Sequence, residues 1–263
     1  YRIMPVQQPQ NSINLEVMRK CLLGVIPGND FKTEPNYGFK FRYLNDKSAF
    51  FMDDHRRLVV TYRLLYDRLA QYELTDGKNP KGAIAALDKL EQEIDPDMFN
   101  MPFQISQEIA RIYKQAGAPE KAARYAKLTL KSLDEQKEIN ESGGKSRYSG
   151  DPAEVLAARA SMYELMGDYD RAKKEYQSQD QSNPNVRGQI ELIDLQQFLD
   201  KKDTVGAINQ LKKTIAGYGK DSGNVAMQRN AEVFKQRLSE LMKNPIDNTA
   251  VSDSTVGSSA HGN

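Results

Sequence analysis

A spaced pattern of small and aromatic residues recurs along the chain and constrains its fold more than any other feature. In the two clearest copies an alanine is followed by a tyrosine three positions on, a glycine seven positions on and an alanine twelve positions on. Such self-similarity predicts stacked copies of one supersecondary unit. The clear copies are Ala110, Tyr113, Gly117, Ala122 and Ala160, Tyr163, Gly167, Ala172; the weaker copies are Ala70, Glu73, Gly77, Gly82 and Leu195, Phe198, Lys202, Ala207.

Close packing between two helices accounts for this pattern. Helices approach closely where the crossing side chains are small, so we expect Ala110 to lie against Ala122. The aromatic ring fills the space above the crossing, and the glycine ends the first helix in a left-handed conformation. The pattern is typical of tetratricopeptide helix–turn–helix units of about 34 residues. The copies start at 70, 110, 160 and 195, so the connections are stretched, and a generic helical bundle is the alternative.

Helical periodicity extends well beyond these positions. From about Met52 to Met242 most segments place apolar residues at helical spacing, with short Gly-, Asn- and Pro-rich breaks between them. We therefore predict an all-α fold, a tetratricopeptide-like helical-hairpin solenoid with an irregular N-terminal cap segment. Its repeats occupy residues 52–243, start near 58, 103, 153 and 188, and end with a closing helix over 224–243. The segment 141–152 is predicted to be a flexible loop.

The two ends of the chain differ from the repeats. Residues 1–51 are punctuated by Pro and Gly, and we expect them to pack on the repeats, with a short strand over 2–6, a helix over 14–23 and an extended stretch over 36–44. Residues 244–263 have almost no large apolar side chains, which predicts a disordered tail. Because the chain begins at Tyr1 and shows no signal peptide, we expect it to be a fragment or a processed form.

The composition argues against several classes of function. The 263 residues carry 37 Lys and Arg against 36 Asp and Glu, so a net charge of +1 offers no field that would attract nucleic acid. A single cysteine, Cys21, forbids an internal disulfide and any multi-cysteine metal site. No apolar run approaches the roughly 18 residues that a membrane span needs. We expect no cofactor, metal, nucleic-acid partner or membrane insertion for this chain.

One short cluster, Asp53, Asp54, His55, Arg56 and Arg57, resembles a catalytic or metal-binding group. Consecutive residues of a helix point about 100° apart, so these side chains cannot all converge on one ligand. We favour a helix start in which Asp53 or Asp54 is the cap and the two arginines form salt bridges. A binding role for the cluster remains the alternative, and catalysis is disfavoured.

Two further motifs do not carry chemistry. The run Gly143-Gly144-Lys145-Ser146 resembles a phosphate loop, but Ile139 stands where that motif requires a glycine, and no strand precedes it. The nucleophile-elbow motif of serine hydrolases is absent from the sequence. We therefore predict no catalytic residue and no enzyme activity for this chain itself.

The sequence instead favours a binding groove. In stacked helical hairpins the first helix of each pair lines a concave face, where peptides dock. We expect a protein or peptide partner there, and a merely solvated face is the alternative. The predicted groove residues are Gln104, Gln107, Arg111, Lys114, Glu154, Ser161 and Glu164.

A family resemblance covers roughly residues 1–130. It rests on Tyr1-Arg2-Ile3-Met4-Pro5-Val6, on Phe51-Met52-Asp53-Asp54-His55-Arg56-Arg57, on Tyr62-Arg63 and Leu69-Ala70, and on residues 83–89 and 116–122. These segments resemble the soluble C-terminal region of polytopic membrane proteins common in Bacteroidota, whose membrane parts are protein O-mannosyltransferase-like, GT-C type glycosyltransferases. The resemblance implies an extracytoplasmic, periplasmic location and an accessory role. The catalytic residues of that family would lie in the membrane part, so none is assigned here.

Three hypotheses of function follow. The first is a non-catalytic interaction or scaffolding domain that forms the soluble part of such a membrane protein and places a partner near the enzyme. The second is a stand-alone periplasmic adaptor without a link to glycosylation. The third is an accessory part of a glycan or acceptor-binding site, with residues 1–60 touching the glycan.

Overall fold

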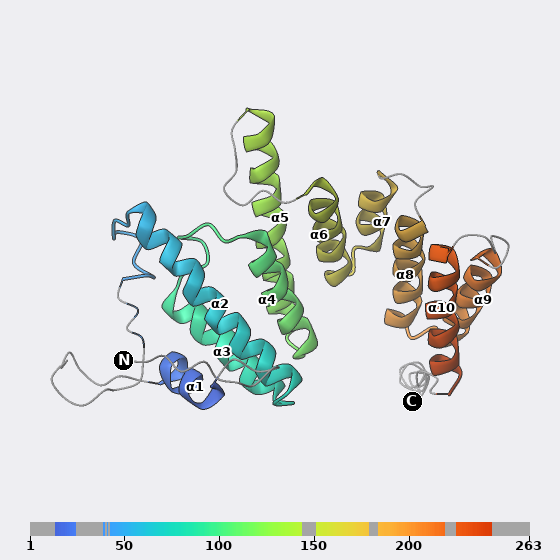
Figure 1. Cartoon of the computed structure of the whole chain (residues 1–263), viewed down its shortest axis with the longest axis horizontal. Coiled ribbons are helices and arrows are strands. Elements are labelled where there is room, and N and C mark those ends of the chain that lie inside the picture. Colours follow the sequence, from blue (N-terminus) through green and yellow to red (C-terminus); the bar gives the residue numbers. More distant parts are fainter. Residues whose placement is uncertain are drawn as a thin grey trace, which may run out of the picture. The chain divides into compact units, whose positions relative to one another are not determined.

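The computed structural model describes residues 14–24, 39, 41, 43–143, 151–178, 184–218 and 225–243. Within these residues the secondary structure consists of ten α-helices and no strand, which confirms the all-α prediction (Figure 1). The helices are α1 (Leu15–Leu23), α2 (Asp53–Thr75), α3 (Pro80–Glu93), α4 (Phe103–Gln115), α5 (Pro119–Glu141), α6 (Pro152–Leu165), α7 (Tyr169–Gln177), α8 (Pro184–Asp200), α9 (Thr204–Tyr218) and α10 (Val225–Lys243). The chain divides into two compact units, Tyr1–Ala158 and Arg159–Asn263.

Two helical hairpins form most of the first unit. Helix α2 packs against α3, α4 packs against α5, and α2 also contacts α4, so the first helices of the two hairpins are neighbours (Figure 1). The buried side of α4 carries Phe103, Ile105, Ile109 and Ile112 at helical spacing. Ser106, Ala110 and Tyr113 are buried as well, and the other side chains of α4 are exposed or half-buried.

The repeated positions have the roles that close helix packing predicts. Ala110 and Ala122 are both fully buried in the second hairpin. Gly117 has φ 85°, a left-handed conformation that ends α4 and that glycine adopts without steric cost. The first hairpin uses a different device, because Gly77 is not left-handed and Lys78 has φ 46° instead. Asn79 then caps α3 by accepting a hydrogen bond from the Gly82 amide at 3.0 Å.

In the first hairpin Glu73 stands where the two clear repeat copies have a tyrosine, and this difference has a structural consequence. Glu73 is 2% exposed and accepts hydrogen bonds from Arg19 of α1 and from Asn79 Nδ2, the latter at 3.0 Å. The Tyr66 hydroxyl of α2 donates to the Leu22 carbonyl of α1 at 2.9 Å. These two contacts hold α1, which lies within the predicted helix 14–23, against the first hairpin.

The second unit is built from helices that pack in sequence order. Helix α7 contacts α8, α8 contacts α9, and α9 contacts α10, which lies where the closing helix is predicted. The core of α8, α9 and α10 comprises Leu195, Ala207, Leu211, Tyr218, Ala231 and Phe234. The left-handed residue recurs here as Gly167 with φ 78° and as Lys202 with φ 55°. Lys202 therefore occupies the backbone conformation of the glycine that it replaces.

Some sequence predictions fall outside the described residues: the strand over 2–6, most of the extended stretch 36–44, positions 144–150 of the predicted loop and the tail 244–263.

One local prediction is wrong. Helix α2 begins at Asp53, and its N-cap residue is Met52, which provides no side-chain hydrogen bond, so neither Asp53 nor Asp54 is the cap. Across the described helices, none combines the length and apolarity that a membrane crossing requires.

Candidate functional site

The predicted groove residues of α4 form an exposed row. Gln104, Arg111 and Lys114 are exposed and Gln107 is half-buried, on the side away from the buried apolar stripe. Their spacing of three or four residues places them along one side of the helix. The structure therefore brings these four residues together on one surface.

The same row continues onto the start of α6. Gln104 Nε2 donates a hydrogen bond to Glu154 Oε1 at 3.4 Å. This bond joins two predicted groove residues that are 50 positions apart in the sequence, one on α4 and one on α6. Ala158 and Leu133, close to this contact, share a small apolar cluster with Phe103. The other two predicted groove residues, Ser161 and Glu164, are half-buried on α6 and belong to the second unit.

The described side chains of the N-terminal cluster make separate contacts, and the side chain of Asp53 lies outside the described part of the structure. Asp54, His55, Arg56 and Arg57 are all exposed on the first turns of α2. Arg57 Nη1 lies 3.7 Å from Asp54 Oδ1, which bears out the expected salt bridge for that arginine. Arg56 instead donates from Nε to the Phe51 carbonyl at 3.4 Å, and its guanidinium lies 5.9 Å from the centre of the Phe99 ring.

A buried carboxyl group that the sequence did not reveal lies on α2. Asp67 is 8% exposed, and its Oδ1 atom is buried without a hydrogen-bond partner. The pKa of Asp67 is raised to about 7, mainly by burial and also by the negative charge of Glu108 on α4, whereas the charge of Arg68 lowers it. A buried, unsatisfied carboxyl with a perturbed pKa is typical of functional sites.

Helices α2 and α4 are in contact, and the negative charge of Glu108 on α4 acts on Asp67 of α2. Glu108 Oε2 lies 3.7 Å from Arg111 Nη1, so Glu108 is paired with the predicted groove residue Arg111. Arg68 is exposed beside Asp67. We call the accessible residues here the α2–α4 face, which comprises Arg68, Gln104, Gln107, Glu108, Arg111 and Lys114.

A buried arginine fixes the connection between α3 and α4, and with it the start of α4. Arg63 is completely buried and donates from Nη1 to the carbonyls of Phe99 at 3.0 Å and Asn100 at 3.4 Å. Its Nη2 donates to the Asp95 carbonyl at 3.4 Å. A guanidinium offers five donors in a rigid fork, so one side chain can satisfy several carbonyls of an irregular segment.

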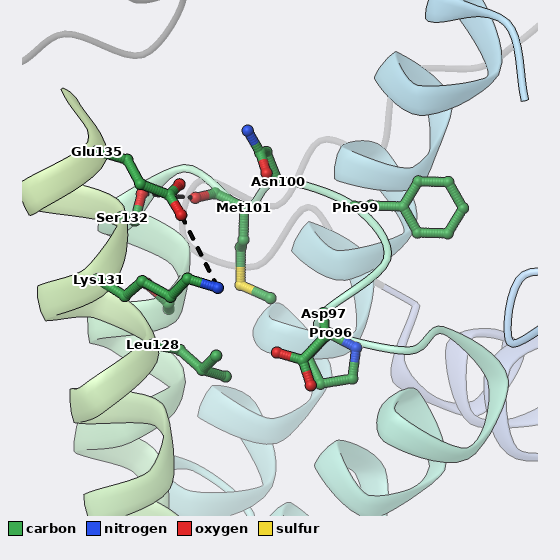
Figure 2. A pocket seen from close by; sticks show the side chains of 10 residues that line it. Pro96, Asp97, Phe99, Asn100, Met101, Leu128, Lys131, Ser132 and Glu135 are labelled. Atoms are coloured by element: carbon green, nitrogen blue, oxygen red, sulfur yellow. Dashed lines mark hydrogen bonds and ion pairs between the residues drawn. The ribbon is translucent and has the colours of Figure 1, made fainter. Parts of the chain in front are cut away.

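A small cavity lies between this connection and α5 (Figure 2). Its volume is about 60 Å³, which suits a few water molecules and not a peptide. Figure 2 shows Lys131 and Glu135 reaching from α5 toward the connection, whereas the Phe99 ring points away. Lys131 Nζ lies 3.8 Å from Glu135 Oε1. The walls are Pro96, Asp97, Phe99, Asn100, Met101, Ser106, Leu128, Lys131, Ser132 and Glu135.

A larger, more apolar hollow of about 350 Å³ lies in the second unit. Four leucines line it, with Arg237 and Glu240 at its edge, 3.4 Å from one another. Neither this hollow nor the smaller cavity contains a predicted groove residue. Within the described ranges, no group of three or more His, Cys, Asp or Glu side chains is placed to hold a metal ion.

Comparison with known proteins gives no match at any level. No protein-family model matches the chain, and neither the search of curated proteins nor that of solved structures finds a significant similarity.

Proposed function

We propose that this chain is a non-catalytic interaction domain that binds a protein or peptide partner along the α2–α4 face. The observation that carries the proposal is the contact between Gln104 and Glu154. It extends the polar row of α4 to the first turn of α6 within the first unit, and a longer polar row offers more contacts to an extended partner. Exposed polar side chains along the row supply hydrogen-bonding groups to its backbone.

The tetratricopeptide-like solenoid belongs to this proposal. It is supported by the fully buried pairs Ala110 with Ala122 and Ala160 with Ala172, which stand at equivalent repeat positions. The left-handed residues Gly117, Gly167 and Lys202 also stand at equivalent positions. In this arrangement α1 is the N-terminal cap, and it packs on the first hairpin through Arg19 and Glu73.

The proposed setting follows from the sequence resemblance over residues 1–130. In that setting the chain is the soluble part of a glycosyltransferase-like membrane protein on the periplasmic side of the inner membrane. The domain would hold a partner or an acceptor protein close to the membrane enzyme. The full reading frame that encodes this chain tests this setting, which requires several apolar segments long enough to span a membrane.

Site-specific photo-crosslinking tests the interaction face. A benzophenone amino acid is introduced at Gln104 or Lys114 of the face, and at Lys127, an exposed residue of α5, as the control. Irradiation of cells that express the native protein should link one identifiable protein to the two face positions and not to Lys127. That protein, once purified, should bind the purified chain directly.

The same experiment can contradict the proposal. Equal crosslinking at Lys127 and at the face positions would show contact without a preferred surface. A crosslinked protein that does not bind the purified chain would show proximity without recognition.

A further inference from the structure

The apolar hollow of the second unit is built from three helices. Residues on the same helix that line it are three or four positions apart, so one side of α8 and one side of α10 form its walls, and α9 contributes a single residue. The hollow measures about 350 Å³, and small-molecule sites span about 300–1,000 Å³. The lining residues are Leu195, Leu199, Leu211, Arg237, Glu240 and Leu241.

The walls of the hollow are aliphatic. Leu195 is 5% exposed and Leu211 is 1% exposed, so these two form its floor. Leu199 and Leu241 are half-buried and stand higher on the walls. Four leucine side chains offer a water molecule no hydrogen bonds, so the hollow suits an aliphatic chain better than it suits water.

The two charged side chains at the edge differ in their remaining capacity for hydrogen bonds. Glu240 accepts through Oε1 from Gln236 Nε2 at 3.2 Å and through Oε2 from Arg237 Nη1 at 3.4 Å, so each carboxylate oxygen already has a donor. Among the described residues Glu240 is the one partner of Arg237, and it engages Nη1 alone. The Nε and Nη2 donors of Arg237 are therefore available to an anion.

The contact between Arg237 and Glu240 does not block such an anion. Their side chains are 64% and 52% exposed, so water screens the attraction between them. A guanidinium presents five donors in one plane. A carboxylate can bind the edge formed by Nε and Nη2 while Nη1 stays with Glu240.

We propose that this hollow binds a single-chain aliphatic carboxylic acid, a fatty acid of medium length. The hydrocarbon chain lies between the leucines, and the carboxylate accepts hydrogen bonds from Arg237. A cationic head group fits less well, because the carboxylate of Glu240 already has a donor on each oxygen. The site lies within the second unit, so this inference goes beyond the proposed function at the α2–α4 face and does not depend on it.

Calorimetry with the intact chain tests both parts of the proposed ligand. In the series butanoate, hexanoate, octanoate, each added methylene that enters the hollow should lower the Kd about fourfold. Octylammonium, which has the same chain length as octanoate and the opposite charge, should bind more weakly than octanoate. Leucine methyl resonances of the hollow should shift when octanoate is added, whereas those of Leu133, buried in the first unit, should not.

A pair of variants isolates the role of the cation. Arg237→Gln removes the charge and keeps a polar side chain, so it should raise the Kd of octanoate at least about tenfold, as expected for hydrogen bonds between charged groups. Arg229→Gln is the matched control, because Arg229 is an exposed arginine about two turns earlier on α10. This control should leave the Kd unchanged.

Several results would overturn the proposal. These are leucine methyl resonances that octanoate leaves unshifted, equal Kd values for octanoate and octylammonium, and an equal loss of affinity in the two arginine variants. Tighter binding of an acetylated tripeptide with a C-terminal leucine would assign the hollow to a peptide terminus instead of a fatty acid. None of these results affects the crosslinking at Gln104 and Lys114, so failure of this site is distinguishable from failure of the interaction face.

Discussion

Arg63 on α2 donates a hydrogen bond from Nη1 to the main-chain carbonyl of Phe99 at 3.0 Å, although its own side chain is completely buried. The same guanidinium reaches the carbonyls of Asp95 and Asn100. Because the segment from Asp95 to Asn100 leads directly into α4, this arginine positions the helix that supplies most of the candidate face.

Replacement of Arg63 by methionine should destabilise the first unit. The variant leaves three carbonyls without their donor, and loss of hydrogen bonds to a charged group costs about 2–4 kcal/mol in total. Arg68→Met is the matched control, since Arg68 is exposed on the same helix and such changes stay within about 0.5 kcal/mol. Urea unfolding measures both values, and equal losses for the two variants would contradict this role of Arg63.

Asp67 should make the stability of the protein depend on pH. Burial raises its pKa from 3.8 to about 7, so the folded state holds this proton more tightly than the unfolded state. The contribution of Asp67 to the free energy of unfolding is complete below pH 4 and is lost as the pH rises to 7. One pKa unit corresponds to about 1.4 kcal/mol, so the loss is on the order of 4 kcal/mol.

Asp67→Asn removes this dependence, because the amide does not titrate. The difference in unfolding free energy between this variant and the native chain should therefore shift in favour of the variant between pH 5 and pH 8. Asp97→Asn, at an exposed position, is the control. A difference between Asp67→Asn and the native chain that stays constant across this range would refute the assignment of Asp67.

The attachment of α1 should depend on Arg19. Its hydrogen bond lowers the pKa of Glu73, so this contribution is present near neutral pH and is lost as the pH falls below the usual glutamate range. Arg19→Ala should speed hydrogen exchange at the amides of α1 and leave those of α4 and α5 unchanged. Lys20→Ala is the control, since Lys20 pairs with Glu16 within α1 itself. Equal acceleration of α1 exchange in both variants would show that Arg19 is not its anchor.

Substitutions at the two left-handed positions Gly117 and Lys202 should change the stability of the protein in different directions. Gly117→Ala places a Cβ atom at φ 85°, which costs about 1–2 kcal/mol. Lys202→Gly relieves the same kind of strain at φ 55°, which raises stability. Glycine also increases the conformational freedom of the unfolded chain, which offsets part or all of this gain. Thermal unfolding compares the two, and a loss in Lys202→Gly as large as that in Gly117→Ala would contradict the equivalence of these positions.

The sequence was sufficient for features that depend on local spacing. Ala110, Gly117 and Ala122 could be assigned because helix pitch and turn geometry restrict which residues fit there, and the row from Gln104 to Lys114 follows from the same periodicity. Asp67 was not predicted, because burial of a carboxyl beside an apolar stripe depends on where α4 lies. Its position beside Tyr66, Leu69 and Ala70, which α2 buries, was the available signal.

The start of α2 shows a second limit. Two aspartates followed by a basic pair resemble an ordinary capped helix start, yet Met52 takes the N-cap position. Which residue is the N-cap depends on the backbone conformation of that one residue. The order of residues near a helix start therefore locates the cap only to within one or two positions.

The most direct test of the central claim is the affinity of the crosslinked partner for two tryptophan variants of the purified chain. Gln104→Trp places a bulky ring on the α2–α4 face, and Lys127→Trp places the same ring at an exposed position on α5. The native chain contains no tryptophan, so both variants also report on folding through their fluorescence. If the face binds the partner, calorimetry will show a Kd raised at least tenfold for Gln104→Trp and unchanged for Lys127→Trp. Equal Kd values for both variants and the native chain would contradict the claim.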